Sequence, residues 1–220
     1  MATYSPRFYV LPRVPALPQP EALPRLVTLG NPRLAQPSAP VDPARIPEQA
    51  FQQQLATPHW VMMQQRSMGI AAPQVGWFDR HFVMILPKEQ RQGGNGDEAE
   101  VVHWINPEIV SHSEEQAWCW EGCLSVPGFR GWVRRPWAIG VRVLDAQGSL
   151  QEKEYGGWEA RSFLHEFDHL EGLLFPYRVA NPRHVVRDEE LEQRGTWPKN
   201  WPAPGAARQP FGVPLREGGR

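Results

Sequence analysis

The stretch LHEFDHLEG, residues 164–172, places His165 and His169 four positions apart, with Glu166 directly after the first histidine. On an α-helix, positions i and i+4 lie on one face, so both imidazoles can reach one metal ion. The adjacent glutamate can then contact a metal-bound water without being a ligand itself. The competing interpretation is an ordinary amphipathic helix with solvated polar side chains. A third ligand and a buried helix would favour the metal site.

The residues around this stretch indicate that the helix is buried. Apolar side chains flank both histidines, at Phe163, Phe167, Leu170, Leu173 and Leu174. Histidines and carboxylates inside a protein need hydrogen-bond partners or a metal. We therefore expect the helix to lie in the core with its polar groups converging on a common partner.

Two positions are candidates for the third ligand. His184 is the only histidine after Gly172, and it lies in a polar stretch. Cys123 lies 42 residues before His165 and follows a glycine in a predicted strand. Three protein ligands with one open position are typical of catalytic rather than structural metal sites.

The two cysteines, Cys119 and Cys123, are not expected to form a disulfide. Four positions apart on one strand they lie on the same face, about 13 Å apart, which is too far to bridge. A reduced compartment is consistent with this, and there a cysteine near a metal motif serves as a ligand or fills the core. We interpret Cys119 as a core residue.

Length and composition indicate one domain with extended ends. The chain has 220 residues, 24 prolines and a formal net charge of -1, which gives no electrostatic argument for binding nucleic acid or an anionic membrane. No apolar run is long enough to span a membrane. We expect a proline-rich arm at residues 1–25, a catalytic domain at 26–180, and a short helix with a proline-rich tail at 181–220. The arm lacks a signal peptide, and its prolines disfavour a transit helix, so a cytoplasmic protein is expected over an organellar one.

Local patterns predict an α+β fold with antiparallel sheets. Apolar spacing predicts a helix over residues 46–65, entered at Asp42 and Pro43. Strands are predicted at residues 81–86, 101–110 and 116–126, followed by a hairpin over 138–155 and a helix ending before Gly172. Strands in the middle and helices towards both ends favour antiparallel sheets over alternating βαβ units.

Three motifs in order resemble the peptide deformylases. They are GIAAPQVG (69–76), EGCLSVPG (121–128) and HEFDHLEG (165–172). The resemblance covers about residues 26–178 and implies antiparallel sheets packed around a central metal-binding helix. It implies a hydrolase that removes the N-formyl group from the initiator methionine of nascent chains, with the ribosome as a candidate partner. One divalent ion is implied on Cys123, His165 and His169, commonly Fe²⁺, with Zn²⁺ and Ni²⁺ substituting.

The resemblance and the chemistry together assign catalytic roles. A metal lowers the pKa of its bound water, and Glu166 is placed to accept the proton of that water and return it to the leaving amine. Gln74 occupies the family position that stabilises the oxyanion, and the backbone N–H of Leu124 is the predicted second donor. Without the resemblance, Gln74 would be interpreted as a surface glutamine.

Substrate contacts are predicted on both sides of the metal. Met68, Gly69 and Ile70 are expected to pair with the substrate main chain as an added strand. Gly122 and Arg130 match substrate-contacting positions of the family. Trp158 and Ser162, one turn apart before His165, are expected to line the methionine pocket.

Other positions depart from or extend the family pattern. Arg66 and Ser67 replace an acidic residue and a glycine, which puts substrate preference in question. Leu164 replaces a glutamine before the first metal histidine and removes a polar neighbour. Asp168 is expected to pair with Arg135. Two alternative functions stay open: a degenerate deformylase-like protein that only binds peptides or ribosomes, and a zincin-type metallopeptidase that cuts internal bonds.

Overall fold

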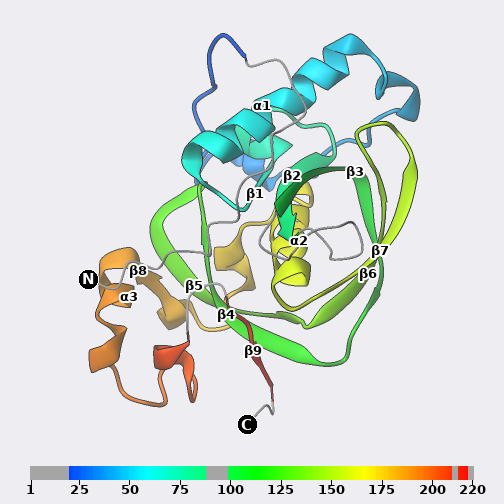
Figure 1. The fold of residues 1–220 in the computed structure, drawn as a ribbon. Coiled ribbons are helices and arrows are strands. Elements are labelled where there is room, and N and C mark those ends of the chain that lie inside the picture. The colour runs from blue at the N-terminus through cyan, green and yellow to red at the C-terminus, as the bar shows by residue number, and fades with distance from the viewer. Residues whose placement is uncertain (1–19, 88–98, 210–212, 218–220) are drawn as a thin grey trace.

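The computed structural model of the chain describes residues 20–87, 99–209 and 213–217. Two antiparallel sheets enclose a central helix, as Figure 1 shows. The predicted α+β class with antiparallel sheets around this helix is confirmed. Residues 1–19 of the predicted proline-rich arm lie outside the described residues. Within the described residues, no helix is long and apolar enough to cross a membrane.

The first sheet has five strands in the order β1-β2-β3-β6-β7. These strands are β1 (Gly69–Ala71), β2 (His81–Pro87), β3 (Ala99–His112), β6 (Ala138–Leu144) and β7 (Leu150–Gly156). The predicted hairpin is β6–β7, whose register runs from Ala138↔Gly156 to Leu144↔Leu150. Because β1 pairs only with β2 in this order, it forms one edge of the sheet.

The second sheet has four strands in the order β8-β5-β4-β9. These are β8 (Val185–Arg187), β5 (Val126–Pro136), β4 (Gln116–Cys123) and β9 (Leu215–Arg216). The sequence patterns predict β4. They do not predict β5, because its arginines, glycine and proline obscure the alternation of apolar and polar side chains. The C-terminal tail supplies both outer strands, so it is part of the sheet and not a free extension.

Helix α2 (Gly157–Leu170) carries the histidine motif and lies between the two sheets (Figure 1). One face packs Ala160, Phe163 and Leu170, all fully buried, against the first sheet. Phe163 makes an edge contact with Phe82 of β2 at 5.0 Å between ring centroids. The opposite face carries His165 towards Glu121 of β4 and Asp168 towards Arg135 of β5. The prediction that this helix is buried is therefore confirmed.

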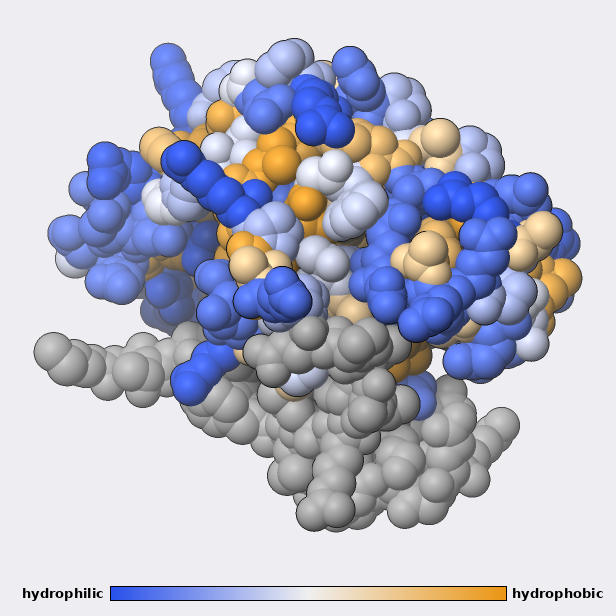
Figure 2. Space-filling model, turned by 90° about the horizontal axis from the view of Figure 1, so that it is seen from above, coloured by the Kyte–Doolittle hydropathy of each residue, from blue (hydrophilic) through white to orange (hydrophobic). Residues whose placement is uncertain are grey.

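Helix α1 (Gln49–Gln65) covers the outer side of β1 and β2 at the top of Figure 1. It begins three residues later than predicted, because Pro43–Arg45 forms a separate 3-10 turn in which the Asp42 side chain accepts from Ala44 N–H. Seen from above, apolar residues gather near the centre of this face and hydrophilic residues surround them (Figure 2). A short helix α3 (Asp188–Glu192) lies in the tail beside β8.

Candidate metal centre

Strand β4 brings a cysteine and a carboxylate to helix α2. Side chains of a strand alternate between its two faces. Cys119, Glu121 and Cys123 are all buried on the face towards α2, whereas Trp120 contacts the tryptophans of the tail on the other face. The irregularity in β4–β5 pairing between Glu121 and Cys123 marks the end of this regular register.

The three predicted ligands meet at one place. Cys123, His165 and His169 offer one ligand atom each, and these atoms lie within 4.8 Å of one another. Cys123 Sγ is 3.2 Å from His169 Nε2, close to the roughly 3.5 Å that two ligands of a tetrahedral zinc-sized ion require. No second group of three such residues meets this criterion within the described parts of the chain. Both cysteines are free thiols, as predicted.

The two imidazoles have different surroundings, and these fit a metal between them. His165 donates from Nδ1 to Glu121 Oε2 at 3.0 Å, which leaves Nε2 as its metal-binding atom. Burial works to lower the pKa of His165, but its hydrogen bonds to Cys123 and Glu121 hold it well above the usual value. Burial, with the charges of His165 and Arg135, lowers the pKa of His169 well below it. The lowered pKa keeps His169 in the neutral form that binds a metal, and Cys123 and Glu121 favour positive charge beside His165, so the three side chains suit a bound divalent metal.

Glu121 was not predicted, and it links the metal site to a buried charge network. Its carboxylate accepts bonds from Arg135 at 2.7 and 2.8 Å and from Arg161 at 2.5 Å, besides the bond from His165. Burial alone would raise the pKa of Glu121, but Arg135, His165 and Arg161 hold it well below its usual value. Glu121 is therefore ionised, and it fixes the ring of His165 in one tautomer.

Arg135 also confirms the predicted ion pair with Asp168, at 2.9 Å. Arg178 completes the pairing of Asp168 at 2.6 Å. Arg161 was not predicted; it lies one turn before His165 on the same helix face, and it donates to the carbonyl of Ala117 at 2.7 Å. The sequence could have predicted this role, because Arg161 lies four positions before His165. At that spacing α2 presents both side chains on one face, to the same neighbouring strands.

Glu166 lies beside the ligands but outside the metal cluster. Its side chain is buried, and Oε2 has no hydrogen-bond partner among the described residues. Burial raises the pKa of Glu166 to about 7, although the charges of His165 and Arg135 lower it. A carboxylate with a pKa near neutrality is well matched to proton transfer.

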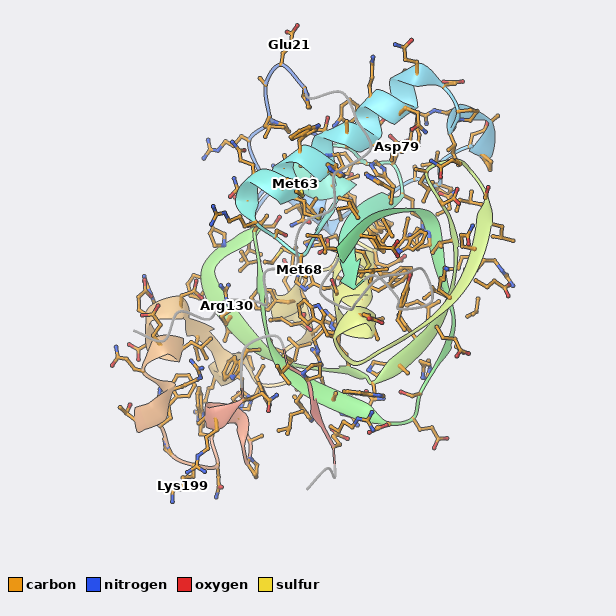
Figure 3. All side chains as sticks on the ribbon, viewed as in Figure 1. Glu21, Met63, Met68, Asp79, Arg130 and Lys199 are labelled. Atoms are coloured by element: carbon orange, nitrogen blue, oxygen red, sulfur yellow. The ribbon has the colours of Figure 1, made fainter. Side chains whose placement is uncertain are left out.

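Gly69 in β1 makes room for this carboxylate. A Cβ atom at residue 69 would lie 2.5 Å from Glu166 Oε1, so only glycine permits the observed approach. Met68, half-buried, precedes β1, and its carbonyl accepts from Ile85 N–H at 2.9 Å. Figure 3 shows Met68 at the start of β1. The segment Met68–Ile70 thus lies at a sheet edge next to Glu166, which is where an added peptide strand could pair.

Gln74 is buried in the 3-10 turn Ala72–Val75 and not on the surface. Its Oε1 accepts from Ala71 N–H at 2.8 Å, and its Nε2 lies 3.4 Å from Cys123 Sγ and 3.2 Å from Ser125 Oγ. The amide N–H is therefore directed at the metal cluster. Leu124 follows Cys123 in the turn between β4 and β5. Ser125 was not predicted, and it anchors this turn by donating to the carbonyl of Val27 at 2.8 Å.

The remaining predicted contacts lie on β4, β5 and α2, around the ligand cluster. Arg130 on β5 packs its guanidinium over Gly122, where a Cβ atom could not fit, and its Nε lies 3.3 Å from Asp188. In Figure 3 it is on the β5 side of the central helix. Ser162 is buried and Trp158 half-buried on α2. Leu164 packs into the apolar cluster of the first sheet, which accounts for an apolar residue at this position.

A buried Cys/His/His cluster, an adjacent glutamate with a raised pKa and a side-chain amide directed at the cluster define a metal-dependent amide hydrolase. Residues 23–185 match the family model described as polypeptide deformylase. The chain belongs to this family, whose members are metal-dependent hydrolases that remove formyl groups from nascent peptides.

Relatives and solved structures agree with the family match. The chain is 40% identical over 174 residues to peptide deformylase 2 of Nostoc sp., covering 79% of this chain and 95% of that protein. Peptide deformylase 2 of Xanthomonas axonopodis pv. citri is 39% identical, with 79% and 97% covered. A Met-Ala-Ser-bound class I type b peptide deformylase from Acinetobacter baumannii superposes with a TM-score of 0.65 at 33% identity, covering 72% and 99%. The Thermotoga maritima peptide deformylase gives a TM-score of 0.62 at 32% identity, with 73% and 99% covered.

Proposed function

We propose that this chain hydrolyses the formamide bond of N-formylmethionyl peptides with Glu166 as general base and Cys123, His165 and His169 as metal ligands. The observation that carries the proposal is the convergence of the ligand cluster, the Glu166 carboxylate and the Gln74 amide beside the edge strand β1. A bound divalent ion supplies a water of lowered pKa and polarises the formyl oxygen.

The chain's own groups then carry the proton and the developing charge. Glu166 accepts the proton of the attacking water and delivers it to the amine that leaves when the C–N bond breaks. Gln74 Nε2 donates to the oxyanion, and the backbone N–H of Leu124 is the second donor. Ala71 fixes the Gln74 amide, since its N–H bonds the carbonyl end and directs the NH₂ end at the site.

The substrate peptide is proposed to pair along Met68, Gly69 and Ile70 as an added strand. The position of β1 at the sheet edge supports this, because an edge strand offers backbone groups for pairing. Gly122 and Arg130 are proposed to contact the peptide beyond its first residue. The Acinetobacter deformylase is bound to Met-Ala-Ser, a short peptide that begins with the methionine this proposal requires.

A paired kinetic assay tests the function. We expect the metal-loaded protein to hydrolyse formyl-Met-Ala-Ser at least about tenfold faster in kcat/KM than acetyl-Met-Ala-Ser. The extra methyl group must displace packed protein, at a cost of ~1–3 kcal/mol. Equal values for the two acyl groups would indicate a general aminoacylase. Cleavage of unformylated peptides at internal bonds would support the metallopeptidase alternative, and peptide binding without turnover would support the degenerate one.

For the native metal we propose one Fe²⁺ ion per chain, with Zn²⁺ or Ni²⁺ as substitutes, because thiolate and imidazole ligands suit all three. Elemental analysis of protein purified without air tests this, and a zinc-only result with full activity would contradict it. We also propose the cytoplasm as the setting and the ribosome as a partner, since the substrate is a nascent chain. Cosedimentation of the protein with translating ribosomes tests the partner.

A further inference from the structure

The pairing of β1 with β2 decides which of its backbone groups face the free edge of the first sheet. In an antiparallel pair, opposed residues alternate between hydrogen-bonded and non-hydrogen-bonded pairs. Ile85 N–H donates to the carbonyl of Met68, so the next opposed pair, Gly69↔Met84, is a non-hydrogen-bonded one. The N–H and C=O of Gly69 therefore point away from β2, towards the edge, whereas those of Ile70 point towards β2.

The edge groups of β1 are already hydrogen-bonded within the chain. Ala71, two positions after Gly69 and so also on the edge, donates its N–H to Gln74 Oε1 at 2.8 Å. The Ser67 hydroxyl donates to the carbonyl of Gly69 and accepts from the N–H of Gly69 at 3.3 Å. Serine hydroxyls form such local bonds to the backbone two positions along the chain. Within β1, Ser67 thus covers both groups of the residue that an added peptide would pair with.

Ser67 is placed so that this cover is removable. Its own N–H donates to the carbonyl of Met62 at 3.0 Å, which fixes its backbone at the turn that leaves α1. Figure 3 labels Met63 and Met68, between which this turn lies. The side chain is only half-buried, so its hydroxyl can rotate to another staggered position and bond to water. The family pattern has glycine at this position, and glycine has no side chain to cover the edge.

We propose that Ser67 competes with the substrate for the edge of β1, so that a peptide pairs with Gly69 only after displacing the Ser67 hydroxyl. This inference rests on the proposed function, because it concerns the peptide that the site binds. The competition weakens the binding of any peptide whatever its side chains, since only backbone groups are exchanged. It leaves the chemical step unchanged, because the hydroxyl is displaced in the bound substrate and in the transition state alike.

Kinetics of the metal-loaded Ser67→Ala variant test the proposal. We expect its KM for formyl-Met-Ala-Ser to fall about fivefold with kcat unchanged. A fivefold change corresponds to about 1 kcal/mol, the net contribution of one hydrogen bond. The affinity for the product peptide Met-Ala-Ser, measured by calorimetry, should rise by the same factor. An unchanged KM and affinity would overturn the proposal. A raised KM would also overturn it, because the hydroxyl would then bind the peptide or merely order β1.

Ser113→Ala is the matched control. The Ser113 hydroxyl also bonds two backbone groups, donating to the carbonyl of Glu115 at 2.8 Å and accepting from Ala138 N–H at 3.0 Å. It lies where β3 pairs with β6 and not beside β1. Its loss should leave KM and kcat at the parent values. An equal fall of KM in both variants would attribute the effect to the general loss of a hydroxyl and would refute the competition.

Amide hydrogen exchange at Gly69 gives a readout that needs no turnover. In the free proteins, exchange should be faster in Ser67→Ala than in the parent, and saturation with Met-Ala-Ser should slow both to the same rate. The same rate in both free proteins would show that Ser67 does not cover this N–H, against the proposal. A parent that binds Met-Ala-Ser but does not hydrolyse formyl-Met-Ala-Ser would contradict the proposed function instead, and exchange and calorimetry would still decide the role of Ser67.

Discussion

Replacing Gly69 with alanine should disable the general base without removing the metal. The new Cβ atom would lie 2.5 Å from Glu166 Oε1, 2.9 Å from Cδ and 3.0 Å from Cγ. Ordinary contact begins at 3.4 Å, so the carboxylate must retreat by about 0.9 Å or β1 must move by the same amount. Strand β1 is held by its pairing with β2, so most of the movement falls on Glu166.

The expected loss follows from this displacement. A misplacement of roughly 1 Å in a reacting group costs on the order of 100-fold in rate. We therefore expect Gly69→Ala to lower kcat/KM for formyl-Met-Ala-Ser about 100-fold. The metal content should be unchanged, because the three atoms nearest the added methyl group all belong to Glu166 and none to Cys123, His165 or His169.

The control is Gly195→Ala in the tail, where an added Cβ meets nothing within 4 Å and the backbone is not left-handed. Steady-state kinetics and elemental analysis on the parent and the two variants decide the outcome. Activity of Gly69→Ala within about threefold of the parent would refute the reasoning, since a displacement of about 0.9 Å could not then matter. Loss of metal together with activity would show that Gly69 acts through the fold and not through Glu166.

Three further outcomes test the site and the network behind it. Glu166→Gln should retain the metal but lose most turnover, because its shape is kept and the proton acceptor is removed; metal loss would instead make Glu166 a ligand. Cys123→Ser should weaken metal binding sharply, whereas Cys119→Ser, buried on the same strand, should cost only packing, and equal losses measured by chelator competition would contradict the assignment. Because the pKa of Glu121 is held below its usual 4.5 in the folded state, its stabilising effect is complete above about pH 4.5 and is lost as the pH falls further. In urea unfolding with a chelator present, the free energy of unfolding should therefore fall less steeply below pH 4.5 for Glu121→Gln than for the parent. The same pH dependence in both proteins would count against an ionised Glu121.

The part of the site that local geometry governs could be predicted from the sequence. His165 and His169 share a helix face because α-helical spacing requires it, and flanking apolar residues such as Phe163 bury that helix. The β6–β7 hairpin could be predicted for the same reason, because alternating apolar and polar residues and the turn residues between them are local features of the sequence. The residues alone left Cys123 and His184 as candidates for the third ligand. The resemblance to the deformylases selected Cys123 and added Gln74, which no local rule brings to the helix.

Other features depend on pairings between distant segments, which a sequence pattern does not specify. Glu121 reaches His165 across 44 residues only because β4 packs its odd-numbered side chains on α2. Strand β5 was not predicted because its arginines, glycine and proline obscure the alternation. The pair of Arg135 with Asp168 was predicted, but the buried bond of Arg135 to Glu121 was not. A charged residue is buried only where its partners are assembled, and the partners come from other elements.

The sequence by itself determined the order of the motifs, the helical spacing of the histidines and the α+β class, since these follow from periods of 3.6 and 2 along the chain. Tertiary structure alone decided that β1 lies at a sheet edge beside Glu166, that Gln74 is buried against Cys123, and that the tail completes the second sheet. Each of these is a contact between segments far apart in the chain. Such contacts are selected by packing and hydrogen-bond satisfaction over the whole molecule and not by the local pattern.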